Sequence, residues 1–385
     1  MTHLTQDQIS ELISLRHDLH RHPEISGQEI ETARRIAEHL TRLGADRLWQ
    51  GLGGHGVAAE FRGTTDGPTL LFRCELDGLP IHEVSEVSYR SAIDGNGHLC
   101  GHDGHMVSLL GVALGLRTRP ARGRVILLFQ PAEETGVGAQ AILDDPRWPE
   151  IRPDFAFAYH NVPGRPLGEI GLRPGPANCA SRGMQILLEG KSSHAAAPED
   201  GTSPGPAMAE LMQVLPELST GKIGDIAFAL STLTHAKLGK PTFGIAPGRG
   251  EIRVTLRSMT DDRMDALVAA AKSLVVQQTA GLSAQIFWHD IFPSVTNDTD
   301  ATEIARRVAG HLEFELYEMP TPMRWSEDFG RFGNQGTKSA MLYVGAGQNH
   351  PQLHNPDYDF PDALIPIVGD LFAGIIADIL GKATT

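Results

Sequence analysis

The chain has 385 residues, a hydrophobic content of 41% and a formal net charge of −14. At about 150 residues per domain this length suggests two or three folded units, of which we take two. The acidic charge argues against a nucleic-acid partner, and no run approaches the roughly 18 apolar residues that a membrane span needs. Three cysteines and a first segment unlike a signal peptide favour a cytoplasmic location.

Two helices are predicted at the start of the chain. Apolar residues from Leu4 to Leu19 recur at roughly helical spacing until His22 and Pro23, where proline disfavours further helix. A second amphipathic helix is expected over residues 29–43. It should end before Gly44, because glycine suits the left-handed conformation of a C-cap.

Four short apolar runs predict buried strands, at residues 69–76, 124–130, 153–159 and 339–345. A mostly apolar helix is expected between the first two, over residues 106–116. This alternation predicts an α/β fold with a mostly parallel central sheet. Ligands collect at the carboxyl ends of the strands in such sheets. The polar residues at or just after these ends are Glu75, Asp77, Glu133, Glu134, His160 and His354.

The middle of the chain predicts a separate unit. Strands are expected at residues 184–189, 225–233, 251–258 and 284–288, and helices at 206–218 and 261–279, the second with Thr260 as N-cap. The order β-α-β-β-α-β is typical of a ferredoxin-like α+β domain. We therefore predict an inserted domain over residues 181–290, and a discontinuous domain formed by residues 1–180 and 291–385.

The stretch from His98 to His105 is the most informative feature of the sequence, because it contains Cys100, His102 and Asp103. Thiolate, imidazole and carboxylate groups bind transition metals. With only two other cysteines in the chain, a four-cysteine structural zinc site is excluded. One of these histidines alone would more often satisfy local backbone groups, but together they favour a catalytic metal site.

A second stretch, from Gln130 to Glu134, places two adjacent carboxylates just after a predicted strand. One carboxylate can bind a metal while its neighbour transfers protons. An acidic first turn of a helix, favoured by the helix dipole, explains this stretch equally well when it is taken alone.

Two other patterns do not indicate a function. Residues 51–56 match G-x-G-x-x-G but precede a predicted strand at residues 57–61 instead of a helix, so we reject a dinucleotide site. Adjacent Ser193 and His194 do not indicate serine catalysis, because triad partners meet in space and the chain has no G-x-S-x-G elbow.

Seven ordered segments resemble the motifs of the M20 metallopeptidase family. More narrowly, they resemble its amidohydrolase branch, which includes hippurate hydrolases, N-acyl-amino-acid amidohydrolases and auxin-conjugate hydrolases. The segments are residues 73–80, 98–103, 130–134, 159–160, 194–198, 325–329 and 353–356.

The resemblance implies a zinc-peptidase-like catalytic domain that binds two divalent metal ions per subunit, which could be zinc, manganese, cobalt or nickel. The implied metal ligands are Cys100, His102, Glu134, His160 and His354. Cys100 would bridge the two ions. Glu133 would act as general base and acid on the water between them, and Asp77 would orient a histidine ligand.

In the inserted domain, His194 resembles a lid histidine that reaches the active site of the neighbouring subunit, which implies a homodimer formed through this domain. The chain departs from the family pattern at Glu75, where the family usually has Asp, and at Gly244, where relatives often carry an Asn that would contact substrate. Spacing alone allows His350 in place of His354, but the Leu-His-Asn-Pro context favours His354. We assign structural or supporting roles to His20, His22 and His105.

The implied function is metal-dependent hydrolysis of the amide bond of an N-acyl amino acid or a similar small conjugate. One alternative is a dipeptidase or carboxypeptidase with the same binuclear site. Another is a binding protein that retains the fold without catalysis. The intact set of Cys100, Glu133 and Glu134 argues against the second alternative.

Overall fold

The computed structural model describes residues 4–382, which form two compact units. The first unit contains the residues up to Ala177, Thr296–Pro320 and the residues from Asp328 onward; the second contains Asn178–Val295 and Thr321–Glu327. Within residues 4–382 no helix combines the length and apolarity needed to cross a bilayer. The prediction that the first segment is unlike a signal peptide includes residues 1–3, which lie outside the described residues.

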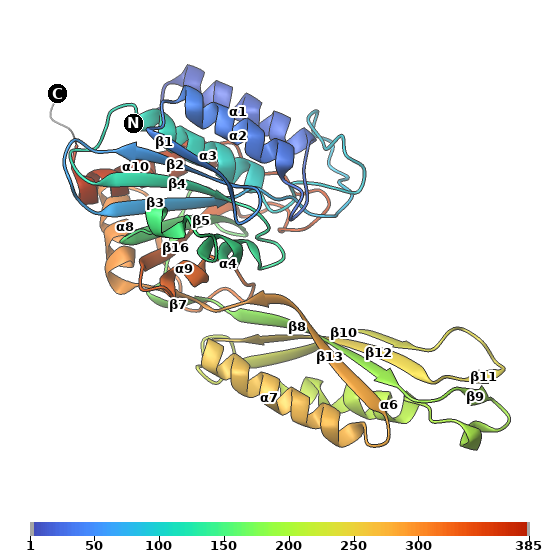
Figure 1. Ribbon diagram of the computed structural model, residues 1–385. Helices are drawn as coiled ribbons and strands as arrows, with labels where there is room; N and C mark the ends of the chain where they lie inside the picture. The colour runs from blue at the N-terminus through green and yellow to red at the C-terminus, as the bar shows by residue number, and fades with distance from the viewer. Residues whose placement is uncertain (1–3, 383–385) are drawn as a thin grey trace. The chain divides into compact units, whose positions relative to one another are not determined.

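An eight-stranded sheet forms the centre of the first unit (Figure 1). Its strands are β1 Arg47–Leu52, β2 Gly56–Arg62, β3 Thr69–Glu75, β4 Arg124–Gln130, β5 Phe155–Pro163, β6 Ile170–Leu172, β15 Leu316–Glu318 and β16 Lys338–Gly347. The order is β1-β2-β4-β3-β5-β16-β6-β15. The central strands β4, β3, β5 and β16 are parallel, whereas β1, β2 and β4 pair antiparallel at one edge. The predicted mostly parallel central sheet is confirmed. Two further strands, β7 Gly175–Asn178 and β14 Val295–Asn297, pair with each other.

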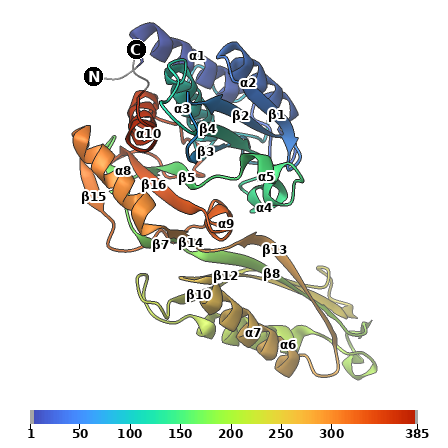
Figure 2. The ribbon, with the colours of Figure 1, turned by 60° about the vertical axis from the view of Figure 1, so that its left-hand side comes forward.

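Helices cover both faces of this sheet. The helices of the first unit are α1 Gln6–Arg21, α2 Ile30–Arg42, α3 His102–Gly115, α4 Gly138–Leu143, α5 Trp148–Ile151, α8 Thr299–His311, α9 Gly330–Gly333 and α10 Leu364–Leu380. Leu70 and Phe72 of β3 share one apolar core with side chains of α1, α2, α3, α8 and α10. Figure 1 shows α4 and α9 on the opposite side of the sheet from α1, α2 and α3. Figure 2 shows α8 and β15 together, at the sheet edge opposite β1.

The boundaries of the first two helices follow from local chemistry. Thr5 and Gln8 form a capping box at the start of α1, and α1 ends before Pro23. After α2, Gly44 adopts a left-handed conformation with φ +82°, as its sequence position predicts. The residues that match G-x-G-x-x-G form the turn of the β1–β2 hairpin, where Leu52 pairs with Gly56. β1 itself is not among the predicted strands.

The predicted start of α3 is wrong by one turn. The helix begins at His102 instead of residue 106, with Gly101 as N-cap at φ +93°. The side chains of His102, Asp103 and His105 in this first turn are all buried. Because they are polar, a search for apolar residues at helical spacing does not include them in the helix. His102, Asp103 and His105 therefore lie on the first turn of α3, whereas His98 and Cys100 precede the helix.

The second unit contains a four-stranded antiparallel sheet in the order β10-β12-β8-β13. Its strands and helices are β8 Ala180–Glu189, β9 Ser193–His194, α6 Gly205–Val214, β10 Ala229–Leu238, β11 Ile245–Ala246, β12 Arg249–Ser258, α7 Asp261–Gln278 and β13 Ser283–Phe292. Thr260 caps α7 as expected, by accepting a hydrogen bond from the backbone of Arg263. The chain order and sheet order are those of a ferredoxin-like α+β unit.

One strand of this unit is displaced from its predicted position. β10 covers Ala229–Leu238, whereas residues 225–233 were expected. The side chain of Asp225 accepts a hydrogen bond from the backbone of Lys222, and its carbonyl accepts one from Phe228. These bonds form a turn, so the strand starts later and extends into residues that are mostly exposed.

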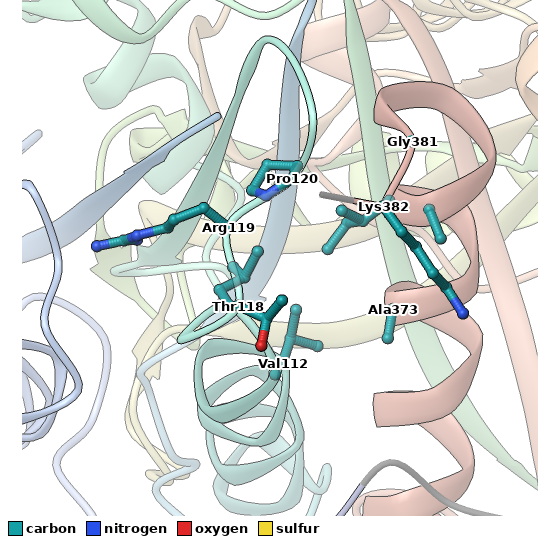
Figure 3. Close-up of a pocket in the computed structure, with 11 residues that line it drawn as sticks. Val112, Thr118, Arg119, Pro120, Ala373, Gly381 and Lys382 are labelled. Atoms are coloured by element: carbon teal, nitrogen blue, oxygen red, sulfur yellow. The ribbon is translucent and has the colours of Figure 1, made fainter. Parts of the chain in front are cut away.

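An apolar cavity of about 330 Å³ lies at the carboxyl end of α3, between this helix and α10 (Figure 3). Val112 and Leu116 line it from α3, and Ala373 and Ile376 line it from α10. Residues 98–105 lie at the opposite end of α3, so this cavity is separate from them.

Candidate metal centre

The polar side chains predicted at the strand ends meet at the carboxyl-terminal end of the central strands. Asp77 follows β3, Glu133 and Glu134 follow β4, and His354 lies in the segment after β16. His160 differs from the prediction in a detail, because it lies inside β5 and not at its end. Since β4, β3, β5 and β16 are parallel neighbours, their carboxyl ends lie side by side.

Metal-ligand atoms gather there in overlapping groups, and the members of each group lie within 4.8 Å of one another. One group contains Cys100, His102 and His160, and a second contains Cys100, Glu134 and His354. Cys100 belongs to both. Together the two groups contain all five ligands that the resemblance implies, and a thiolate shared by two groups is the arrangement that a bridging ligand requires.

Asp77 fixes the orientation of the His102 ring. The Nδ1 of His102 donates to the backbone carbonyl of Asp77 at 2.9 Å and lies 3.4 Å from Asp77 Oδ1. The other oxygen of Asp77 accepts hydrogen bonds from Ser26 at 2.7 Å and from the backbone of Glu134 at 3.0 Å. With its proton on Nδ1, His102 presents the lone pair of Nε2 to the centre, as a metal-binding imidazole must.

His160 is oriented in the same way. Its Nδ1 donates to the backbone carbonyl of Asn161 at 2.9 Å, and its Nε2 lies 3.4 Å from the sulfur of Cys100. Both side chains are buried. The imidazole lone pair and the thiol are therefore aimed at the same point.

A tight turn after β4 places the two carboxylates. Ala132 has a positive φ of +49°, and its backbone amide donates to Glu29 at 2.7 Å. The chain then turns back, so that Glu133 Oε2 lies 4.0 Å and Glu134 Oε1 3.8 Å from His102 Nε2. Glu133 is adjacent to the ligand groups and belongs to neither of the two that share Cys100.

His354 joins the cluster from the segment that follows β16. Its backbone has φ +65°, which is uncommon outside glycine, and its amide donates to the Leu99 carbonyl at 2.8 Å. Its Nε2 lies 3.5 Å from Glu134 Oε2. The ring of His350 instead donates to the carbonyl of Asp359 at 2.5 Å, so the structure brings His354 and not His350 to the centre.

The electrostatics of the cluster favour bound cations. Burial lowers the pKa of His102, but the nearby Glu75, Asp77 and Glu134 together raise it to about 10. Burial, Glu134 and Glu133 raise the pKa of the Cys100 thiol well above its usual value. His102 Nε2, Asp77 Oδ1 and Glu134 Oε1 are buried without a hydrogen-bond partner. A divalent ion would satisfy such atoms and hold the thiol as a thiolate, so these residues fit two metal ions.

A second polar cluster lies behind the first turn of α3. Asp103 Oδ2 accepts hydrogen bonds from Arg16 at 3.0 Å and from His20 at 2.9 Å, and His20 Nε2 lies 3.2 Å from Glu83. His98, also in the metal-binding stretch, is buried nearby, and burial lowers its pKa to about 4. His20 and His98 are not in the ligand groups found among the described residues.

A third set of buried polar residues supports the centre from the sheet. Arg73 forms ion pairs with Glu75 and Asp328, and Glu75 Oε2 lies 2.6 Å from His105 Nδ1. His105 Nε2 lies 2.5 Å from the side-chain oxygen of Asn161. Sequence reasoning identified Glu75 and His105 but missed Asn161. The one available signal was its position directly after His160 at the end of an apolar run.

His194 belongs to the second unit, whereas the candidate ligands lie in the first. It lies on β9, opposite Ile245 of β11, and its Nδ1 accepts a hydrogen bond from the backbone of Ala196 at 3.0 Å. The amide of Ala195 donates to the carbonyl of Gly244 at 3.1 Å. The two lid features noted in the sequence, His194 and Gly244, are therefore neighbours on one two-stranded ribbon.

Comparison with known proteins supports the motif-based interpretation. Residues 71–378 match the model of peptidase family M20/M25/M40. The N-acetylcysteine deacetylase of Bacillus subtilis is 30% identical over 375 residues, which cover 96% of this chain and 97% of that protein. The hippurate hydrolase of Campylobacter jejuni is 27% identical, with 94% and 95% covered. Among solved structures, a dinuclear metal-binding peptidase of the M20 family from Bacillus subtilis is 26% identical, covers 98% of this chain and 100% of its own, and superposes with a TM-score of 0.81.

These similarities extend over nearly the whole chain and so confirm the resemblance inferred from seven separate segments. They also confirm the expected α/β fold and the expectation of two metal ions. The alternative of a non-catalytic binding protein is not favoured, because the named relatives are enzymes. The chain belongs to peptidase family M20/M25/M40 and is a metal-dependent hydrolase of amide bonds.

Proposed function

We propose that this enzyme hydrolyses the amide bond of N-acyl amino acids or similar small conjugates and releases a carboxylic acid and a free amine. The observation that carries this proposal is the pair of donor groups that share Cys100, with Glu133 beside them. The relatives named for N-acetylcysteine deacetylation and hippurate hydrolysis support the substrate class. The dipeptidase or carboxypeptidase alternative is not favoured by these relatives.

The proposed ligands are Cys100, His102, Glu134, His160 and His354. When bound, two divalent ions would supply Lewis acidity toward the scissile carbonyl and toward the attacking water. Glu133 takes a proton from the attacking water and delivers it to the leaving nitrogen. Asp77 holds His102 in the tautomer that leaves Nε2 free. The mixed thiolate, imidazole and carboxylate set suits zinc, and manganese, cobalt and nickel are the other candidates.

We further propose that His194 helps to hold the carbonyl or carboxylate of the substrate in the active site of a second copy of the chain. The exposed position of His194 on the β9–β11 ribbon is consistent with this role. The domain predicted over residues 181–290 would then serve as both lid and dimerisation surface. All three cysteines are buried free thiols, which agrees with the proposed cytoplasmic location.

The test is release of free amine from N-acetyl, N-benzoyl and dipeptide substrates by metal-stripped protein to which zinc, manganese, cobalt or nickel is restored. Metal-dependent turnover of N-acyl amino acids, with little turnover of dipeptides that have a free amino group, is the expected result. Preferential turnover of those dipeptides would favour the peptidase alternative instead.

A further inference from the structure

Asn161 contacts several parts of the metal centre at once, although it supplies no ligand atom to the donor groups. It is fully buried and directly follows His160 in β5. Its backbone carbonyl accepts the hydrogen bond from His160 Nδ1 at 2.9 Å. Its side-chain nitrogen donates to the Cys100 carbonyl at 3.2 Å and to the hydroxyl of Tyr358. Asn161 therefore connects β5, the start of α3 and the segment that carries His354.

The turn that carries the central thiol packs directly on this amide. A Cβ atom added at Gly101 would lie 2.9 Å from the Asn161 side-chain oxygen and 3.0 Å from its nitrogen. Gly101 also has φ +93°, a conformation that favours glycine. The backbone between Cys100 and His102 therefore approaches Asn161 as closely as a residue without a side chain permits.

The orientation of Asn161 is itself fixed by a buried chain of polar groups. Its side-chain oxygen faces His105 Nε2 at 2.5 Å, and His105 Nδ1 faces Glu75 at 2.6 Å. Glu75 forms an ion pair with Arg73, and all four side chains are buried. Reversal of the Asn161 amide would place its nitrogen against the His105 ring and its oxygen against the Cys100 carbonyl. Because the Cys100 carbonyl can only accept, the amide nitrogen stays on the side of Cys100 and Tyr358 and the amide oxygen faces His105.

We propose that Asn161 is a positioning residue of the metal centre, held in orientation by His105 and Glu75, and that it sets the spacing of Cys100 relative to His160 and His354. This inference rests on the proposed ligand set, because it concerns the geometry of those side chains. Outer residues of this kind commonly change metal affinity by about 10- to 100-fold when they are replaced.

The decisive variant is Asn161→Asp, which keeps the size and the acceptor facing His105 but removes both N–H donors. A matched control exists at Asn297, which is also buried in the first unit. Its side-chain nitrogen donates to the carbonyls of Arg173 and Met341 at 3.0 and 2.9 Å, away from the donor groups. Asn297→Asp thus makes the same chemical change in a purely structural setting.

The measurements are the stoichiometry and affinity of zinc binding by competition with a chromogenic chelator, thermal unfolding, and the visible spectrum of the cobalt-loaded protein. We expect Asn161→Asp to weaken the binding of at least one ion by about 10- to 100-fold and to change the cobalt spectrum. Asn297→Asp should lower thermal stability yet bind both ions as the wild type does. Glu75→Gln, which leaves Asn161 in place, should weaken the same ion by a smaller factor and serves if Asn161→Asp fails to fold.

Three results would overturn the inference, and each is distinguishable from the others. If Cys100→Ser retains both ions with unchanged affinity, the ligand assignment is wrong and this inference falls with it. If Cys100→Ser loses metal while Asn161→Asp and Glu75→Gln match the wild type in affinity and cobalt spectrum, only the positioning role of Asn161 is wrong. Equal weakening by Asn161→Asp and Asn297→Asp would reduce the effect to general destabilisation and would also overturn it.

Discussion

His102 and Asp103 are consecutive buried residues in the first turn of α3, yet they belong to polar clusters of different composition. The ion-pair partners of Asp103 are Arg16 and His20, so the protein supplies the positive charge itself. The ion-pair partners of Glu134, beside His102, are the imidazole rings of His102 and His354, which can coordinate a metal ion. Both clusters concentrate carboxylates, but in the Asp103 cluster an arginine pairs directly with the carboxylate of α3, whereas near His102 the buried Arg73 pairs with Glu75 and Asp328.

This difference agrees with the proposed ligand set, in which the His102 cluster binds metal ions and the Asp103 cluster does not. Arg16 also pairs with Asp359 at 2.8 Å and with Asp362 at 2.5 Å, and these carboxylates raise its pKa although burial opposes the charge. The guanidinium of Arg16 is always charged and balances the negative charge of these carboxylates, so they do not need a bound metal ion. The His102 side relies on groups that a divalent ion can coordinate. We therefore expect changes on the two sides to affect different properties of the protein.

The largest effect is expected for Glu133→Gln, on the metal side. The amide cannot accept a proton from water, so kcat should fall by about a thousandfold or more, while both metal ions remain bound and the protein stays folded. Steady-state kinetics on an N-acyl amino acid, with metal analysis of the same sample, measures this. Glu60→Gln is a suitable control, because Glu60 is buried but pairs with Arg62 and Arg124 away from the centre. Activity within tenfold of wild type in Glu133→Gln would refute the assigned base.

On the other side, Arg16→Met should mainly affect stability. It leaves Asp103 buried without its guanidinium partner, and loss of one partner of a buried pair typically costs about 3–5 kcal/mol. We expect a loss of this size in the free energy of unfolding, measured by urea denaturation. The folded enzyme should keep its number of bound metal ions. Loss of metal without loss of stability would show that the two clusters are not separate in function.

The Asp103 cluster should also make stability depend on pH. Burial opposes a charge on His20, but Asp103 and Glu83 raise its pKa to about 9, compared with 6.5 in an unfolded chain. The charged ring therefore stabilises the fold fully below pH 6.5, and this contribution, up to about 3 kcal/mol, is lost as the pH rises towards 9. The difference in unfolding free energy between wild type and His20→Gln should shrink over this interval. A constant difference from pH 6 to pH 9 would contradict the assignment.

These clusters also show what the sequence could predict. The strands and the ligand candidates were predictable because apolar runs and short metal-binding spacings are local patterns. The first turn of α3 was not, since its polar side chains are satisfied by residues distant in sequence, such as Arg16 for Asp103 and Glu75 for His105. The role of Asn161 is hidden for the same reason, because its contacts depend on parallel strands that meet only in the fold.

The smallest effect is expected outside both clusters, at Gly244. A Cβ added there would have no atom within 4 Å, so Gly244→Asn should be accommodated without loss of stability. The added amide lies on the ribbon that carries His194, and in the family pattern it contacts substrate. We expect KM for an N-acyl amino acid to fall by about two- to fivefold, which corresponds to about 0.4–1 kcal/mol, with kcat and metal content unchanged. Gly310→Asn, at an equally open position on α8, is the control. An unchanged KM in Gly244→Asn would mean that this ribbon does not contact the substrate, and it would count against the proposed role of His194 as well.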